Sequence, residues 1–337
     1  MTESLNIALA QINPRVGDVD GNIDLIRKAR AKAAADGCDL IVTGELVVSG
    51  YPPEDLVLKP AFQDHVEATV KALAKETNDG GPALLIGAPW RQNGDLYNAA
   101  LLLDEGRMSG LMLKHVLPNY GVFDEMRVFS VGPAPGPLMF RDVALGVMIC
   151  EDMWTPDVTE CLDETGADIL VVLNGSPFEV DKTDTRLNLA TARTLESTLP
   201  LIYVNLMGGQ DELVFDGDSF VLSAEGEVQV QQRQCESQTV ATEWRKGPTG
   251  KWACKKGPIA DRPGQMEAIY RTLVQGLRDY VQKSHFPGVL IGMSGGIDSA
   301  LSAAVAVDAL GPDAVHCVMM PSPYTSNDSL EDAAAAC

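Results

Sequence analysis

Three reactive side chains in the first half of the chain each directly follow a run of strand character. They are Glu45, Lys114 and Cys150. A cysteine thiol is mostly protonated at neutral pH, so a nucleophilic cysteine needs a base or a nearby cation. A carboxylate could take the thiol proton, and an ammonium could stabilise the oxyanion that forms when a carboxamide is attacked. Together the three side chains are sufficient for amide hydrolysis through a thioester.

Each of these residues also has an ordinary structural interpretation. A lone cysteine at a strand end is most often a small core residue, because free cysteine is among the most buried residue types. A glutamate or a lysine just past a strand is most often a solvated loop charge. The chemical interpretation requires that the strands place the three side chains along one edge of a sheet, which spacing alone leaves open.

The apolar pattern predicts alternating strands and helices that could do this. Strands are predicted over residues 5–11, 39–42, 83–89, 96–103, 108–113, 143–149, 169–173, 201–205 and 220–223. Helices are predicted over residues 22–35, 62–78, 157–164 and 184–197. Strands that alternate with helices, together with a meander over residues 83–113, favour a two-sheet α/β domain flanked by helices.

The residues around the three side chains resemble the three signatures of the nitrilase superfamily. The matching stretches are Gly44-Glu45-Leu46, Lys114 with Leu117-Pro118-Asn119-Tyr120, and Cys150-Glu151-Asp152-Met153-Trp154. The resemblance covers about residues 4–240 and implies a four-layer αββα sandwich. It also implies that Glu45 is the base, that Lys114 stabilises the oxyanion and that Cys150 is the nucleophile.

The same resemblance implies contacts with a glutamine substrate. Carried over by position, these contacts are Tyr120, Glu125, Ser176 and Lys182, with Glu125 also helping to position Lys114. Their ordinary interpretations are a packed aromatic residue, a loop acid, a turn serine and a solvated lysine. A lysine that can reach a carboxylate favours an amino-acid substrate over a simple nitrile.

A glycine-rich turn near the end of the chain is the second candidate site. It joins a predicted strand over residues 288–292 to a predicted helix and comprises Gly292-Met293-Ser294-Gly295-Gly296-Ile297-Asp298-Ser299. Glycines allow close backbone approach, and N–H groups at a helix start can bind phosphate oxygens. Asp298 could add a magnesium ligand. The alternative is a plain turn in which aspartate and serine cap the helix. The turn is neither a Gly-Lys-Ser/Thr P-loop nor GxGxxG.

This turn resembles the SGGxDS loop of the ATP pyrophosphatases. The resemblance implies ATP with Mg²⁺ as a substrate complex, without a tightly bound prosthetic group. It also implies that residues 266–337 begin a Rossmann-like domain, which we expect to follow a linker over residues 241–265. Residues 320–326 are similar to the segment after the second strand of NAD synthetases.

An amidase domain followed by an adenylating domain resembles the glutamine-dependent NAD synthetase family. The resemblance implies L-glutamine, ATP and deamido-NAD as partners, and a homo-oligomer. In that family the synthetase domain continues well beyond the point that corresponds to residue 337. We therefore expect this sequence to be a fragment of a longer protein.

Composition limits the classes of partner and compartment. A net charge of -21 argues against sequence-independent nucleic-acid binding and against an anionic membrane surface. Seven cysteines without CxxC spacing fit a reducing cytosol better than a disulfide framework. Neither a signal peptide nor an apolar run of roughly 18–20 residues is found. We expect a cytoplasmic protein with no membrane and no nucleic-acid partner.

Three alternatives remain open at this stage. A stand-alone nitrilase-family amidase with a vestigial ATP-binding tail would hydrolyse an amide without ATP. Other amidotransferases with an SGGxDS loop, such as GMP synthetase, fit less well because their glutaminase domains use a cysteine, histidine and glutamate triad. A non-catalytic nucleotide-binding or assembly protein would leave one of the three reactive side chains idle.

Overall fold

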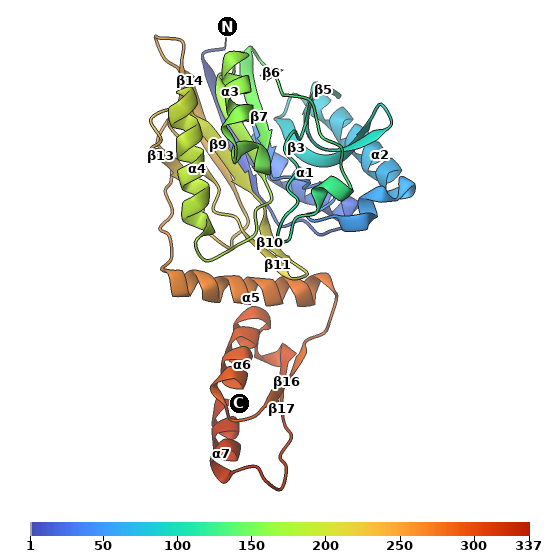
Figure 1. Cartoon of the computed structure of the whole chain (residues 1–337), viewed down its shortest axis with the longest axis vertical. Coiled ribbons are helices and arrows are strands. Elements are labelled where there is room, and N and C mark those ends of the chain that lie inside the picture. The colour runs from blue at the N-terminus through green and yellow to red at the C-terminus, as the bar shows by residue number, and fades with distance from the viewer. Residues whose placement is uncertain (1) are drawn as a thin grey trace. The chain divides into compact units, whose positions relative to one another are not determined.

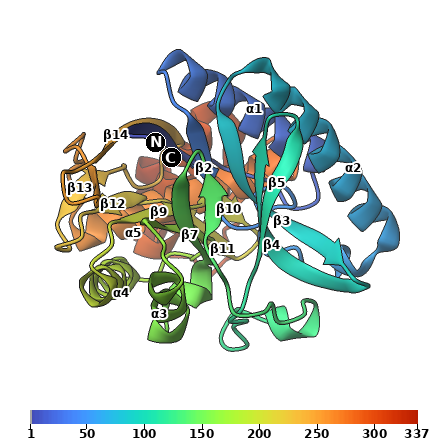
Figure 2. The same ribbon diagram turned by 90° about the horizontal axis from the view of Figure 1, so that it is seen from above.

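Two mixed β-sheets form the frame of the first part of the computed structural model, which describes residues 2–337 (Figures 1 and 2). One sheet contains β1 (Ser4–Gln11), β2 (Leu40–Thr43), β3 (Ala83–Gln92), β4 (Asp95–Asp104), β5 (Arg107–Leu113), β14 (Gln238–Lys246) and β15 (Trp252–Cys254). The other contains β6 (Leu138–Phe140), β7 (Val143–Ile149), β8 (Ile169–Asn174), β9 (Leu201–Asn205), β12 (Phe220–Leu222) and β13 (Val228–Gln231).

Strand order brings the ends of the key strands together. The seven-stranded sheet has the order β15-β14-β1-β2-β3-β4-β5, and the six-stranded sheet has the order β13-β12-β9-β8-β7-β6. Strands β1, β2 and β3 are mutually parallel, as are β7, β8 and β9. The carboxyl ends of β7 and β8 lie at the same edge of their sheet, and a hydrogen bond from the Glu45 N–H to the Asn174 carbonyl joins the loop after β2 to the end of β8.

Four helices cover the outer faces of these sheets (Figure 2). Helices α1 (Val19–Ala35) and α2 (Pro60–Glu76) pack on the seven-stranded sheet, and α3 (Pro156–Glu164) and α4 (Lys182–Ser197) pack on the six-stranded sheet. Between the sheets, Leu9 and Val42 pack with Val147 in one buried apolar cluster. A second cluster joins Leu162 of α3 to the other face of the six-stranded sheet. The predicted four-layer αββα sandwich is confirmed.

The chain separates into two compact units. The first comprises the residues up to Met207 together with Phe215–Arg262, and the second comprises Gly208–Val214 with Pro263–Cys337. Within residues 2–337, no helix combines the length and the hydropathy that crossing a membrane requires.

The second unit contains one βαβ crossover. Its elements are α5 (Gln265–Lys283), β16 (Val289–Met293), α6 (Ile297–Leu310), β17 (Val315–Met319) and α7 (Asn327–Ala336). Strands β16 and β17 are parallel neighbours, and α6 connects them. Val274 of α5 packs against Val305 and Ala309 of α6. This arrangement agrees with the expected start of a Rossmann-like domain.

Two segments differ from the expectation. The linker expected over residues 241–265 begins inside β14, and β15 follows it in the same sheet. Trp244 and Trp252 anchor these strands because both are buried. Strand β14 pairs over residues 238–245 with β1, more than 200 residues away, a partner that no local pattern indicates. The hairpin of β10 (Met207–Gln210) and β11 (Leu213–Asp216) was likewise not expected.

Candidate active site

Glu45 lies in the loop after β2 and is fully buried. Its backbone N–H donates to the Asn174 carbonyl at the end of β8, at 3.2 Å. The loop passes so close to β3 that a Cβ added to Gly87 would lie 2.3 Å from the Leu46 nitrogen. Only glycine permits this approach, so β3 and β8 together fix the position of the Glu45 backbone.

Lys114 directly follows β5 and places its ammonium between two carboxylates. Its Nζ lies 2.7 Å from Oε1 of Glu45, and 2.9 and 2.8 Å from the two carboxylate oxygens of Glu125. Burial lowers the pKa of Lys114, but Glu125 and Glu45 raise it, and the net pKa lies well above its ordinary value. The ammonium therefore stays charged inside the fold.

Cys150 follows β7 at the start of the short 3-10 helix η4 (Cys150–Met153). Its φ of 46° is in the left-handed region, which a non-glycine residue rarely adopts outside turns and functional sites. Burial raises the pKa of the thiol well above its ordinary value; Glu45 raises it further, whereas Lys114 lowers it. The resting thiol is protonated, so nucleophilic attack requires a base at that moment.

The two oxygens of the Glu45 carboxylate have different surroundings. Burial raises the pKa of Glu45 to about 7, while Lys114 opposes the shift. Oxygen Oε1 accepts hydrogen bonds from Lys114 and from Nδ2 of Asn98, at 2.7 and 2.8 Å. Oxygen Oε2 is buried and has no hydrogen-bond partner within residues 2–337. One oxygen is thus anchored and the other is open to a proton.

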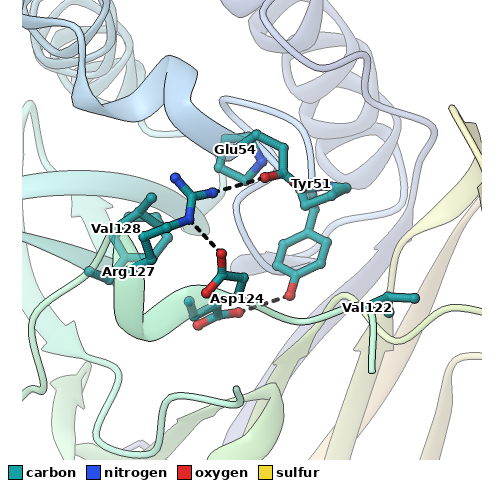
Figure 3. Close-up of a pocket in the computed structure, with 10 residues that line it drawn as sticks. Tyr51, Glu54, Val122, Asp124, Arg127 and Val128 are labelled. Atoms are coloured by element: carbon teal, nitrogen blue, oxygen red, sulfur yellow. Dashed lines mark hydrogen bonds and ion pairs between the residues drawn. The ribbon is translucent and has the colours of Figure 1, made fainter. Parts of the chain in front are cut away.

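Glu125 is held from several sides in the short 3-10 helix η3 (Glu125–Arg127). Besides Lys114, the hydroxyl of Tyr51 donates to its Oε1 at 2.9 Å. Figure 3 shows this Tyr51 contact beside a small pocket of about 20 Å³. On the outer side of that pocket, Arg127 forms ion pairs with Asp124 and Glu54. These contacts attach the segment that carries Glu125 to the loop that follows β2.

Asp152 is a buried group that sequence reasoning did not select. Its Oδ1 accepts the backbone N–H groups of His115 and Val116, at 3.0 and 2.8 Å. Its Oδ2 accepts the N–H of Ile149 at 3.0 Å. Asp152 therefore joins the segment that follows Lys114 to the turn that carries Cys150. Only its place two residues after the cysteine could have pointed to it.

A cavity of about 570 Å³ accommodates two of the expected glutamine contacts. Its lining includes Tyr120, Phe123, Trp154 and Lys182. The Lys182 ammonium lies 5.5 Å from the ring centroid of Phe123 and 5.9 Å from that of Trp154. The Tyr120 hydroxyl donates to both carboxylate oxygens of Glu151, the residue after the thiol, at 3.0 Å. The cavity thus combines aromatic walls with the Lys182 ammonium, which forms an ion pair with Glu179 in the same lining.

Ser176 differs from the other expected contacts. It is buried, and its hydroxyl accepts a hydrogen bond from Nε of Arg186 at 3.1 Å. Arg186 also donates to the Ser176 carbonyl and forms a buried ion pair with Asp216 at 2.7 Å. These bonds fix the turn after β8, which lies against the base: a Cβ added to Gly175 would be 2.9 Å from Oε2 of Glu45.

The glycine-rich turn of the second unit joins β16 to the start of α6. Gly295 has a φ of 79°, and a Cβ there would lie 2.3 Å from the Ser329 carbonyl oxygen. Helix α6 starts with Gly296 as its N-cap and has no side-chain capping bond. The first backbone N–H groups of the helix therefore have no acceptor from a capping side chain and can donate to a ligand. Asp298 is exposed in the first turn. A cavity of about 230 Å³ adjoins the turn and includes Gly292, Met293 and Ser294 in its lining.

A buried base, ammonium and thiol beside two facing sheets form the set that cysteine-dependent hydrolysis of a carbon–nitrogen bond requires. The chain belongs to the carbon-nitrogen hydrolase family, whose family model matches residues 6–253. Residues 269–337 match the NAD synthase family model.

Curated relatives share both parts of the chain. The glutamine-dependent NAD(+) synthetase of Rhodobacter capsulatus is 47% identical over 99% of this chain, and that of Acinetobacter baylyi is 39% identical over 98%. This chain spans about 60% of the length of each of these relatives.

Solved structures of an NAD+ synthetase and of an amidase are similar to this chain. A glutamine-dependent NAD+ synthetase from Acinetobacter baumannii in complex with ADP has a TM-score of 0.92 and 39% identity, covering 98% of this chain and 62% of that chain. An amidase from Nesterenkonia sp. has a TM-score of 0.64 and 26% identity, covering 73% of this chain and 92% of that chain.

Proposed function

We propose that this chain hydrolyses the side-chain amide of L-glutamine at Cys150, and that the longer protein uses the ammonia to convert deamido-NAD to NAD with ATP. The observation that carries the proposal is the divided role of the Glu45 carboxylate. One oxygen accepts from Lys114 at 2.7 Å, and the other is buried without a partner within residues 2–337, near a thiol whose pKa is raised. The choice of glutamine as substrate follows from the relatives, which are glutamine-dependent NAD(+) synthetases.

In the first step Cys150 becomes acylated. Glu45 takes the thiol proton while the sulfur attacks the amide carbon, and the carbonyl electrons move to the oxygen. The Lys114 ammonium stabilises this oxyanion electrostatically. The tetrahedral intermediate collapses, the C–N bond breaks, and the proton held by Glu45 passes to the departing nitrogen, which leaves as ammonia. A γ-glutamyl thioester on Cys150 remains.

In the second step water releases glutamate. Glu45 removes a proton from the water that attacks the thioester carbon, and Lys114 again faces the oxyanion. When the C–S bond breaks, the sulfur recovers its proton from Glu45 and the free thiol is restored. Glu45 therefore alternates between base and acid, a role that suits a pKa of about 7 at neutral pH.

The aromatic cavity supplies selectivity for an amino acid. The Lys182 ammonium can pair with the α-carboxylate of glutamine, and Tyr120 can contact the substrate beside it. Glu125 positions Lys114, and Ser176 shapes the turn beside Glu45. We infer that removing Lys182 raises KM for glutamine far more than it lowers kcat, because the lysine contacts the end of the substrate that does not react.

The second unit is proposed to bind ATP. Backbone N–H groups of residues 294–299 can donate hydrogen bonds to phosphate oxygens at the start of α6, and Asp298 can share Mg²⁺ with those oxygens. Within residues 2–337 no group of three or more histidine, cysteine or acidic residues is placed to hold a metal ion. In the complete protein, ATP would adenylate the carboxylate of deamido-NAD, and ammonia would displace AMP.

Glutamate release from glutamine tests the proposal. We expect the 337-residue chain to release glutamate, and the Cys150→Ala and Glu45→Gln variants to lose this activity. Asparagine, which is one methylene shorter, serves as the control amide and should be a poor substrate. Release that persists in Cys150→Ala would overturn the proposed mechanism. Hydrolysis of simple aliphatic amides in preference to glutamine would favour the stand-alone amidase.

A further inference from the structure

Asn98 is a buried asparagine in β4 that contacts every charged member of the site. Its side chain is fully inaccessible to solvent. Its backbone carbonyl accepts the N–H of Lys114 at 2.9 Å. Its side-chain Nδ2 lies 2.8 Å from Oε1 of Glu45 and 3.4 Å from Oε2 of Glu125.

The orientation of the Asn98 amide follows from its neighbours. If the amide were turned round, its carbonyl oxygen would face two carboxylates, and neither could donate a hydrogen bond while ionised. The NH₂ group must therefore point at the acids. Its Oδ1 then points elsewhere and has no hydrogen-bond partner within residues 2–337. A buried acceptor without a partner costs free energy of folding. The hydrogen bonds of the Asn98 NH₂ group to the two carboxylates are the contacts that offset this cost.

Asn98 and Lys114 bind the same oxygen of Glu45. Both donate to Oε1, at 2.8 and 2.7 Å. Two donors on one oxygen fix the rotation of the carboxylate and leave Oε2 as the oxygen without a donor. A lysine alone could also bind the opposite oxygen or both oxygens, because its ammonium is not directional. A second donor of fixed geometry removes that freedom.

A neutral donor is also the suitable kind of group at this position. The site already contains Glu45, Glu125 and one ammonium, so a further acid would add repulsion. A further cation would make the Glu45 carboxylate a weaker base. An amide NH₂ donates to both carboxylates without changing the charge of the cluster, and its hydrogen bond to Glu45 moderates the rise in that carboxyl's pKa caused by burial.

We propose that Asn98 is a positioning residue for the base: its NH₂ group fixes Oε1 of Glu45 so that Oε2 receives the thiol proton of Cys150. The inference deepens the proposed amide hydrolysis and rests on the same site. Asn98 itself contacts neither the thiol nor the substrate, and it acts through Glu45. An effect of Asn98 must therefore disappear when Glu45 can no longer act as a base.

The test is a double-mutant cycle that measures alkylation of Cys150 by iodoacetamide. Iodoacetamide carries a carboxamide, and peptide mass spectrometry separates Cys150 from the other six cysteines. We expect Asn98→Ala to slow alkylation at neutral pH about tenfold, within the range of coupling between contacting residues. In the Glu45→Gln background the same change should have no effect.

The pH dependence gives a readout that a purely structural role would not move. Removing a donor from an ionised carboxylate raises its pKa, so the alkylation midpoint of Asn98→Ala should shift to higher pH. The other groups that face Glu45 remain in place: Lys114 after β5, Glu125 in η3, Cys150 in η4 and Tyr51. The isosteric Asn98→Asp variant should shift the alkylation midpoint in the same direction. This variant replaces Asn98→Ala in the test if the alanine variant does not fold.

Asn22→Ala is the matched control. Asn22 is also buried, but its side chain hydrogen-bonds the backbones of Arg15 and Val48. Its removal should leave the rate and the midpoint at Cys150 unchanged. Equal slowing of Asn98→Ala in both backgrounds, an unmoved midpoint, or equal slowing by the control would overturn the inference. Because iodoacetamide reports on the thiol alone, these results stand even if glutamine proves not to be the substrate.

Discussion

At the scale of single residues, the site places one ammonium against two carboxylates in a volume that excludes water. Glu45, Lys114 and Glu125 are all buried, and their contacts are 2.7 to 2.9 Å long. In a low-dielectric environment each charge depends on the others, because an unpaired ion loses its hydration without compensation. The same burial shifts the pKa of Glu45 towards neutrality. Burial of these charges therefore both makes the fold depend on their pairing and raises the pKa of Glu45.

Lys114→Met should destabilise the fold strongly. The change leaves two buried carboxylates without a counter-charge, and we expect the free energy of unfolding to fall by about 3–5 kcal/mol. Urea denaturation followed by circular dichroism measures the loss. The control is Lys71→Met, which breaks the surface pair with Glu67 and should cost less than about 1 kcal/mol. Equal losses in the two variants would contradict the buried network.

The pH dependence of amide hydrolysis should report the Glu45 carboxyl. Burial raises the pKa of Glu45 to about 7, and only the carboxylate form can accept the thiol proton. Activity should therefore be low below that pH and rise as pH increases through it. The measurement is kcat/KM for glutamate release at a series of pH values. A profile that is flat between about pH 5 and 8 would mean that another group is the base.

At the scale of elements, the site residues follow strands of both orientations: β2 and β7 have parallel neighbours, whereas β5, which precedes Lys114, pairs antiparallel with β4. Glu45, Lys114 and Cys150 each follow a short apolar run, and their surroundings carry family motifs, so their position was predictable, and their catalytic roles stay predictions. The role of Asn98 was not predictable, because an asparagine inside a strand has no local signal. The contacts of Asp152 were not predictable either, because the signature around Cys150 contains this residue without indicating its partners. Their partners are distant: 53 residues separate Asn98 from Glu45, and 37 separate Asp152 from His115.

Asp152→Ala should separate the two segments that Asp152 joins. The change leaves three backbone N–H groups without their acceptor, those of His115, Val116 and Ile149. We expect a loss of about 3 kcal/mol in the free energy of unfolding, because each unsatisfied buried donor costs about 1–3 kcal/mol and the segments partly relax. Urea denaturation provides the measurement. Asp157→Ala, in the exposed first turn of α3, should change stability little; a similar loss there would contradict this role.

At the scale of the whole molecule, the chain contains two units with separate apolar cores. One core joins the two sheets of the sandwich, and another joins α5 to α6. The general organisation was predictable because both units carry motifs and periodic elements. The boundary was not, because residues 241–254 lack a local period and form strands through pairing with β1 and the burial of Trp244 and Trp252.

The separate cores predict two unfolding transitions. Differential scanning calorimetry should resolve them, because each unit has its own buried apolar cluster. Leu173→Ala should lower the transition of the sandwich, and Ala309→Ser should lower the other. We expect losses of about 2–5 kcal/mol for the leucine, the usual range for a buried leucine replaced by alanine. A single transition that moves with both variants would contradict independent units.

Trapping the acyl-enzyme tests the central claim most directly. The chain is mixed with glutamine, quenched in acid within the first turnover and digested for peptide mass spectrometry. The account predicts a γ-glutamyl group on the peptide that contains Cys150, and none on that peptide in the Cys150→Ala variant. Glutamate formation without any acylated Cys150, or a γ-glutamyl group on a different residue, would contradict catalysis through a Cys150 thioester.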